Sequence, residues 1–357
     1  MASTSIPIPH GANALQWAAR LSIGLAAVVV VLGAFTRLVD AGLGCPDWPG
    51  CYGHLTWPTA SADIAAAEAR FPDTPVDLAK TWPEMVHRYF AATLGLVIVG
   101  FTGLAWRRRG DTGDPRTGGA AAPPLRLCLL LLAMVLLQGA FGAWTVTLKL
   151  WPQVVTAHLL GGFTTLSLLW LLALRVGALG LTSSYALPAR FRLHAALALL
   201  VVVLQIAMGG WVSSNYAALA CPDFPTCHGQ WWPAEMDAAA GFNVMQSVGP
   251  NYLGGLLEGD ARVAIQVAHR LGAILVLVVV GSLIYRLWRR RYRLALPLAA
   301  VLALQIALGI ANIVLLLPLA VATAHNAVGA ITLLLLVTVN YGAFAGLSST
   351  APRSAAI

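Results

Sequence analysis

Charged side chains are scarce in this sequence. Lys, Arg, Asp and Glu make up 10% of its 357 residues, whereas hydrophobic residues make up 59%. The mean hydropathy of +0.77 is far above that of a soluble domain. This composition excludes an ordinary soluble protein and indicates an integral membrane protein. The net charge of +8 comes from arginines that cluster between apolar segments, so membrane topology explains it and we expect no nucleic-acid partner.

Eight apolar segments are long enough to cross a bilayer, which takes roughly 20 residues. They cover residues 17–39, 84–106, 125–147, 154–176, 192–214, 263–285, 294–317 and 319–342. The first segment is too long for the core of a signal peptide, so we expect it to be retained as a span. The sequence therefore predicts an all-α polytopic membrane protein.

Arginines concentrate in three of the loops between these segments. They are Arg107, Arg108, Arg109 and Arg116, then Arg175, Arg190 and Arg192, then Arg286, Arg289, Arg290, Arg291 and Arg293. Loops rich in Lys and Arg stay in the cytoplasm. Both termini are therefore expected on the cytoplasmic side, and loops 40–83, 148–153 and 215–262 on the outer side.

Cysteines are also few, and four of the five form two close pairs in the outer loops. Cys45 and Cys51 bracket five residues, as do Cys221 and Cys227. Outward loops permit disulfides, so the pairs are expected to form them. Closing so short a loop adds less stability than closing a long one, which leaves a redox or a local positioning role open. Cys128 stands alone in the third span as a small apolar residue.

An internal repeat divides the chain into two sets of four spans. The matches come in the same order in both sets: Cys45–Cys51 with Cys221–Cys227, His87-Arg88 with His269-Arg270, Gln138 and Gly142 with Gln305 and Gly309, and Thr156-Ala157-His158 with Thr323-Ala324-His325. We expect two tandem four-helix bundles, residues 1–176 and 192–357, joined by a cytoplasmic linker at 177–191. Both halves begin and end on the same side, so a pseudo-twofold axis along the membrane normal should relate them.

Four of the eight histidines lie at one depth in the membrane. His10, His54, His194 and His228 are expected in tails or loops, whereas His87, His158, His269 and His325 lie one to two turns inside the even-numbered spans. A lone histidine in a membrane is often bonded to a neighbouring helix. Two per half at matched depth favour the axial ligands of one haem in each bundle. Zinc or copper fits less well, because each half offers two nitrogens and no thiolate within the membrane.

Small residues and arginines accompany these histidines. Gly161 and Gly272 follow a histidine by one turn and would let a flat macrocycle approach the backbone. Arg37, Arg88 and Arg270 lie at the same outer level. Their guanidinium groups are either interfacial anchors or partners of haem propionates.

One position near the histidines differs between the halves. Glu84 precedes His87 by three residues, and Gln266 precedes His269 by the same spacing. Thr81-Trp82-Pro83-Glu84 is also typical of a helix start, so Glu84 could simply cap its helix. A glutamine cannot exchange a proton, whereas a carboxylate beside a macrocycle can act as acid, base or charge stabiliser. We therefore expect chemistry in the N-terminal pocket and electron supply from the C-terminal one.

At these residues the chain resembles the haem A synthases of proteobacteria and mitochondria. The resemblance rests on Gly44–Cys51, Glu84–Arg88, Ala264–Arg270 and the duplicated four-histidine plan. It implies oxidation of the C8 methyl of haem O to a formyl group by successive hydroxylations, which gives haem A for terminal oxidases. It also implies the bacterial inner membrane, with the cysteine loops in the periplasm.

The resemblance assigns a role to each half. It implies a haem b cofactor on His269 and His325, and the substrate haem O on His87 and His158 beside a catalytic Glu84. A Cys45–Cys51 disulfide would lie near the substrate. Candidate partners are haem O synthase, oxidase assembly factors and an electron donor of unspecified kind.

Two other functions would use the same paired histidines. A di-haem b electron-transfer cytochrome would explain the pairs but not the change from Glu84 to Gln266. A haem carrier or chaperone for oxidase assembly would bind haem without turnover. Haem O synthase itself is excluded, because prenyl transfer needs aspartate-rich diphosphate sites and no DxxxD cluster occurs within the spans.

Overall fold

The computed structural model describes residues 14–109, 123–180 and 186–345, and these are predominantly helical. The two chain ends, Arg116 and part of the predicted linker lie outside the described residues. Eight of the described helices are long and apolar enough to cross a membrane, which confirms the eight predicted spans. They are α1 (Ala14–Leu38), α3 (Leu78–Arg107), α4 (Leu125–Thr147), α5 (Pro152–Arg175), α6 (Arg192–Ser214), α8 (Gly259–Arg289), α9 (Ala295–Val314) and α10 (Leu319–Ala345).

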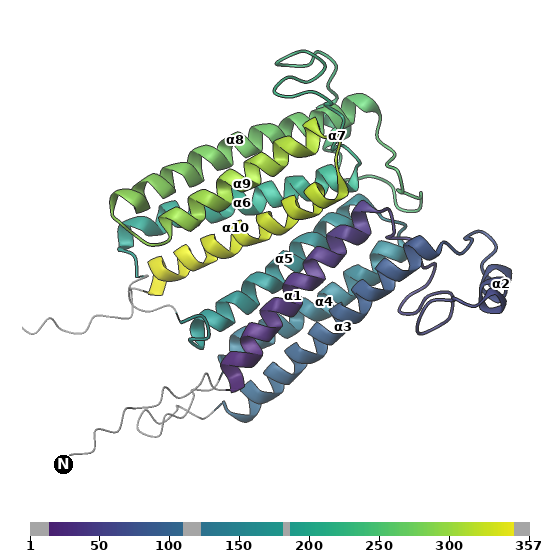
Figure 1. The fold of residues 1–357 in the computed structure, drawn as a ribbon, viewed down its shortest axis with the longest axis horizontal. Coiled ribbons are helices and arrows are strands. Elements are labelled where there is room, and N and C mark those ends of the chain that lie inside the picture. Colours follow the sequence, from purple (N-terminus) through teal and green to yellow (C-terminus); the bar gives the residue numbers. More distant parts are fainter. Residues whose placement is uncertain (1–13, 110–122, 181–185, 346–357) are drawn as a thin grey trace, which may run out of the picture.

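The spans form two groups of four (Figure 1). In the first group α1 and α4 each contact α3 and α5, and in the second α6 and α9 each contact α8 and α10. The groups meet through α1 with α10, α5 with α6, and α5 with α10. In the repeat α1 corresponds to α6 and α5 corresponds to α10. The contact of α1 with α10 therefore corresponds to the contact of α6 with α5. The packing is therefore consistent with the predicted pseudo-twofold relation.

Apolar packing is closest at one end of the bundle. The largest buried cluster takes residues from all eight spans, for example Ile98, Leu131, Leu172, Leu283 and Leu336. Lipid tails are as apolar as leucine, so close packing rather than escape from water favours this contact. The cluster belongs to the part of each helix that faces the arginine-rich loops.

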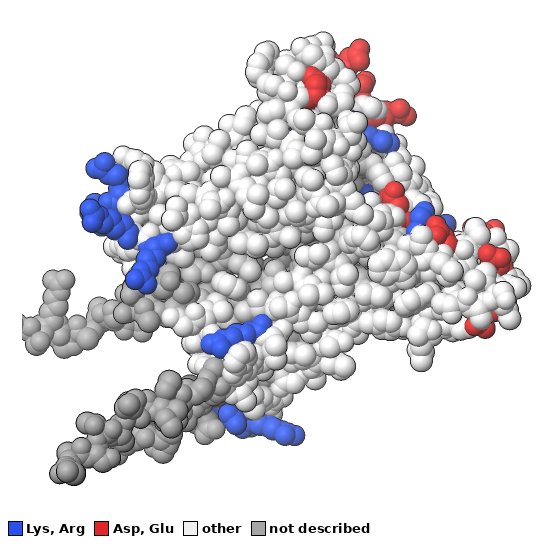
Figure 2. All heavy atoms as spheres, viewed as in Figure 1, with Lys and Arg blue, Asp and Glu red and all other residues white. Residues whose placement is uncertain are grey.

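Charges separate along the length of the molecule (Figure 2). Basic side chains without acidic neighbours gather at one end, acidic side chains lie at the other end beside a few basic ones, and the surface between carries few of either. Such a surface suits a protein that crosses a bilayer. Short helices α2 (Ser61–Arg70) and α7 (Ala238–Gly241) lie in the loops at the acidic end (Figure 1).

Both cysteine pairs form disulfides, as the sequence predicts. Each loop closes with a short bridge, Cys51 to His54 and Cys227 to Gln230. Inside each loop an aspartate carboxylate accepts two backbone N–H groups: Asp47 from Tyr52 and Gly53, and Asp223 from His228 and Gly229. The Thr226 hydroxyl and these backbone donors hold the pKa of Asp223 at about 2, well below its usual range. The duplication therefore extends to the detailed loop structure.

The predicted start of the second span is wrong. Helix α3 begins at Leu78, and the Asp77 side chain caps it by accepting the Ala79 N–H at 2.9 Å. Pro83 consequently lies inside the helix. Glu84 is in the second turn and does not cap its own helix. This removes the structural explanation that the sequence left open for the carboxylate.

Candidate functional site

The histidines of the first half face each other. His87 on α3 and His158 on α5 have ring centroids 6.4 Å apart, with planes at 88°. Two imidazole nitrogens that bind one metal ion from opposite sides are about 4 Å apart, because each bond is about 2 Å long. The ring centres then lie roughly 6 Å apart. Residues 87 and 158 are thus spaced as two axial ligands of one iron would be.

The helices pack less closely at the level of the histidines. On α3 the buried residues stop at Met85 and resume at Leu94, and on α8 they stop at Gln266 and resume at Val276. The remaining spans show the same interruption, for instance between Leu131 and Val146 on α4. Such a layer suits a broad, flat ligand in each half.

Each histidine ring lies against a glycine of a neighbouring helix. A Cβ at Gly33, Gly142, Gly209 or Gly309 would meet the Cε1 atom of His87, His158, His269 or His325, at 2.9, 3.7, 3.5 and 3.2 Å respectively. The sequence had indicated Gly161 and Gly272 for the close approach to a macrocycle. Those two glycines instead face the side chains of Gln138 and Gln205. The repeated Gln-x-x-x-Gly spacing could have identified three of the four glycines that contact the rings, Gly142, Gly209 and Gly309, but not Gly33.

Within the described residues, the Nδ1 atoms of His87, His158 and His325 are buried without a hydrogen-bond partner. No group of three or more His, Cys, Asp or Glu side chains in the described part of the chain could hold a metal ion. Two imidazoles with unbonded nitrogens, each packed against a glycine, are a better fit to haem than to a metal ion that only protein side chains would bind.

Glu84 joins α3 to the first disulfide loop. It is 4% exposed, and its Oε2 accepts the Cys45 N–H at 2.9 Å. Its other oxygen is paired with the Arg88 guanidinium. Arg88 Nη1 in turn donates to the main-chain oxygens of Asp47 and Gly50. The carboxylate is therefore held between the loop and its own helix, one turn from His87.

The second half keeps the arginine and lacks the ion pair. Gln266 is also 4% exposed, and its Oε1 is buried without a hydrogen-bond partner among the described residues. Arg270 donates to four main-chain oxygens of the second loop, at Cys221, Asp223, Pro225 and Thr226. In both halves the guanidinium binds loop carbonyls, and pairing with a haem propionate stays a prediction.

Arg37 connects the two halves. Its guanidinium donates to the Tyr216 hydroxyl at 2.9 Å and to the Ser213 main-chain oxygen at 2.5 Å, and it stacks over the Tyr216 ring. The same group pairs with Asp40, which also accepts the Tyr216 hydroxyl. These contacts join the C-terminal end of α1 to that of α6. Neither interpretation offered by the sequence anticipated this bond between halves.

Replacing Arg270 with Met should release the second disulfide loop. Bonds from a charged donor contribute about 1.5–3 kcal/mol each, so the amides of Cys227 and Gln230 should exchange hydrogen at least about tenfold faster. Hydrogen-exchange mass spectrometry of the detergent-solubilised protein measures this. Arg262→Met is the matched control, since Arg262 on the same helix binds Gly255 and Leu257 instead. Unchanged exchange at Cys227 and Gln230 would show that Arg270 does not hold the loop.

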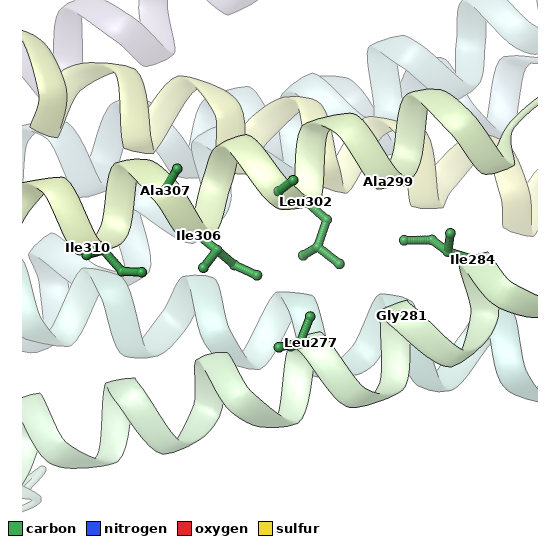
Figure 3. A pocket seen from close by; sticks show the side chains of 9 residues that line it. Leu277, Gly281, Ile284, Ala299, Leu302, Ile306, Ala307 and Ile310 are labelled. Atoms are coloured by element: carbon green, nitrogen blue, oxygen red, sulfur yellow. The ribbon is translucent and has the colours of Figure 1, made fainter. Parts of the chain in front are cut away.

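His194 was expected in a loop but lies in the first turn of α6. Its Nε2 is 3.0 Å from the Ser282 hydroxyl, and Arg286 lies 2.8 Å from its Nδ1. An apolar groove of about 490 Å³ lies between α8 and α9 (Figure 3). It is lined by residues such as Leu277, Leu302 and Ile306, and contains no histidine or charged group. Neither feature belongs to the histidine layer.

Comparison with known proteins identifies the family. The sequence matches the COX15-CtaA family, described as cytochrome oxidase assembly protein, over residues 16–337. A haem A synthase of Shewanella oneidensis is 42% identical over 338 residues, which cover 94% of this chain and 98% of the relative. Haem A synthases of Cereibacter sphaeroides and Azorhizobium caulinodans are 31% and 29% identical, over 88% and 85% of this chain and 83% and 86% of theirs. The chain belongs to the haem A synthase family.

Proposed function

We propose that this protein is a haem A synthase that oxidises the C8 methyl of haem O to a formyl group by successive hydroxylations. The proposal is supported most strongly by the 42% identity to the haem A synthase of Shewanella oneidensis, which aligns over nearly the whole of both chains. The eight spans and the paired histidines fit a haem-modifying membrane enzyme. The product, haem A, would serve terminal oxidases.

Haem O is proposed to bind in the first half, between His87 and His158. The 6.4 Å ring separation suits two axial ligands, and Gly33 and Gly142 leave room beside the rings. Glu84 lies one helical turn from His87 on the same face of α3. It is the ionisable side chain that the second half lacks. These features support substrate oxidation in the first pocket.

Haem b is proposed as the resident cofactor of the second half, held by His269 and His325. Both rings lie against glycines, as in the first half. When bound, haem b supplies one-electron transfer. Gln266 stands where Glu84 does and cannot exchange a proton, so this pocket is suited to electron supply rather than to proton-coupled chemistry.

Glu84 is proposed to accept a proton, or to stabilise positive charge, while the methyl group is oxidised. The Cys45 N–H and the Arg88 guanidinium hold its two oxygens in place, which fixes the carboxylate before substrate binds. Because the Cys45–Cys51 disulfide closes the same loop, the disulfide positions the donor of one of these bonds. Positioned acid or base groups contribute about 10²–10⁴-fold to rate.

We also propose an orientation in the bacterial inner membrane. The end at which Figure 2 shows basic side chains without acidic ones would lie in the cytoplasm. The disulfide loops at the other end would then be periplasmic, where disulfides form and persist. The histidine layer would lie in the outer part of the bilayer.

Expression of the protein in cells that make haem O but no haem A tests the function. Haems extracted from the membranes are separated by chromatography. We expect haem A together with a hydroxylated precursor. Only haem b and haem O in the extract, at normal protein levels, would contradict the enzyme and point to an electron-transfer cytochrome or a haem carrier.

A further inference from the structure

Each disulfide loop exposes large apolar side chains at corresponding positions. Trp48 and Phe224 are exposed, and each follows the first cysteine of its pair by three residues. Leu55 is 86% exposed and Trp231 is 79% exposed, and each follows the second cysteine by four residues. The adjacent Trp232 is exposed as well. A single exposed apolar side chain needs no explanation, but the same pattern in both halves indicates a surface that contacts something apolar.

Both loops lie against the side of a membrane-spanning helix. The Tyr89 hydroxyl on α3 donates to the main-chain oxygen of Leu55 at 2.6 Å. The first disulfide belongs to one buried cluster with Met85 of α3, and Val267 of α8 packs against the cluster of the second disulfide. These helix residues lie within the apolar parts of α3 and α8. The loops therefore fold back along the helices instead of extending beyond their ends.

The lengths of the helices place the loops relative to a bilayer. Arg88 precedes Arg107 on α3 by 19 residues, and Arg270 precedes Arg289 on α8 by the same number. At about 1.5 Å per residue this is about 28 Å, close to the roughly 30 Å thickness of the hydrocarbon core. Arg88 and Arg270 both bind main-chain oxygens of their disulfide loops. A hydrocarbon core that begins at Arg107 and Arg289 would therefore end at the level of both loops.

The two loops lie on opposite sides of the molecule. In Figure 1 the loop that contains α2 lies at the end of α3, and the loop between α6 and α7 lies on the far side, next to α8. A protein bound at one side would leave the loop at the other side exposed. A bilayer surrounds the molecule and meets both loops at one level. Tryptophan is also typical of the membrane–water interface.

Another exposed apolar residue lies at a different level. Met245 is 84% exposed, and the segment around it is held to the first turn of α5 by a bond from Gln153 Nε2 to the Val244 main-chain oxygen at 2.9 Å. Gln153 precedes Arg175 on the same helix by 22 residues. This corresponds to about 33 Å, which is beyond the hydrocarbon core. Met245 is therefore expected in water and provides an internal reference.

We propose that the tips of the two disulfide loops, Leu55 in the first half and Trp231 with Trp232 in the second, insert into the bilayer leaflet on their side. Each disulfide fixes the shape of its loop, so insertion orders little additional chain. The first loop also donates the Cys45 N–H to Glu84. Lipid would thus hold from outside the loop that holds this carboxylate. The inference concerns lipid contact and does not depend on the haem chemistry.

Hydroxyl-radical footprinting of the unmodified protein tests the second loop. One chain per nanodisc is placed in phosphatidylethanolamine and phosphatidylglycerol, and oxidation of each side chain is measured by mass spectrometry relative to the unfolded protein. We expect Trp231 and Trp232 to be protected at least about tenfold more than Met245, because burial of a large apolar side chain shifts its partition by about this factor or more. Protection equal to that of Met245 would overturn the proposal and indicate a docking surface for a protein.

Photo-cross-linking tests the first loop. The photoreactive p-benzoylphenylalanine replaces Leu55 or, as the matched control, Met245, and the nanodiscs are irradiated. The Leu55 variant should form lipid adducts at least about tenfold more often than the Met245 variant. If the Leu55 variant does not assemble, the same replacement at Trp48 takes its place. Equal yields of lipid adduct, or adducts to another protein in intact cells in place of lipid, would contradict insertion of this loop.

Discussion

Replacing Glu84 with Gln should stop haem A formation while both haems stay bound. The change removes one ionisable group and keeps the shape of the side chain. Gln266 shows that glutamine is accepted at this place in the fold. The amide oxygen can still accept the Cys45 N–H, so the loop should keep its position. Loss of a positioned acid or base lowers the rate by about 10²–10⁴-fold.

Single-turnover formation of haem A from bound haem O measures this effect. Glu68→Gln is the matched control, because Glu68 lies in the segment between α1 and α3 and its carboxylate accepts an exposed backbone N–H of Val76. It should keep the native rate. Hydrogen exchange at the Cys45 amide distinguishes loss of the catalytic group from loss of the loop contact. If this amide is still protected in Glu84→Gln and haem A no longer forms, the lost activity is due to the missing carboxylate. Native rates in Glu84→Gln would reduce Glu84 to a structural tie between loop and helix.

Replacing His269 with Ala should remove the resident haem b and abolish haem A formation. One of the two proposed axial ligands is lost, and His325 alone would remain to bind the iron. We expect haem b per chain to fall at least about tenfold, since loss of even a supporting contact costs 10–100-fold in affinity. Pyridine haemochrome spectra of the purified protein measure the content.

Two controls accompany this variant. His194→Ala removes a histidine of α6 whose ring contacts Ser282 and Arg286, away from the histidine layer, and should keep haem b. Added imidazole should restore binding in His269→Ala if the fold is intact. Full haem b occupancy in His269→Ala without imidazole would rule out the second half as the cofactor site.

Much of the architecture could be predicted from apolar runs alone. A helix must satisfy its backbone within the bilayer, so a run of about 20 apolar residues leaves one solution. The pairing of Cys45 with Cys51 followed equally directly from their short separation in an outward loop. The repeat then related His87 to His269 and isolated Glu84 as the difference between the halves.

One error was local, at a helix cap, and the other features that the sequence did not show arise where distant segments meet. The start of α3 at Leu78 depends on Asp77, whose capping is masked in the sequence by the stronger-looking Thr81–Glu84 pattern. For Arg88 the sequence indicated a propionate partner or an interfacial anchor, and it did not show the main-chain oxygens of Asp47 and Gly50, which only the folded loop brings to this side chain. The contact of Gln205 with His269 joins α6 to α8, and local sequence does not specify which glutamine reaches which ring.

The division of labour between the halves is tested most directly by removing one ligand from each in a protein that cannot turn over. In the Glu84→Gln background, from cells that supply both haems, the bound haems of His158→Ala and His325→Ala are identified by chromatography. We expect that His158→Ala loses haem O and keeps haem b, and that His325→Ala loses haem b and keeps haem O. Loss of the same haem from both variants, or the reverse pattern, would contradict it.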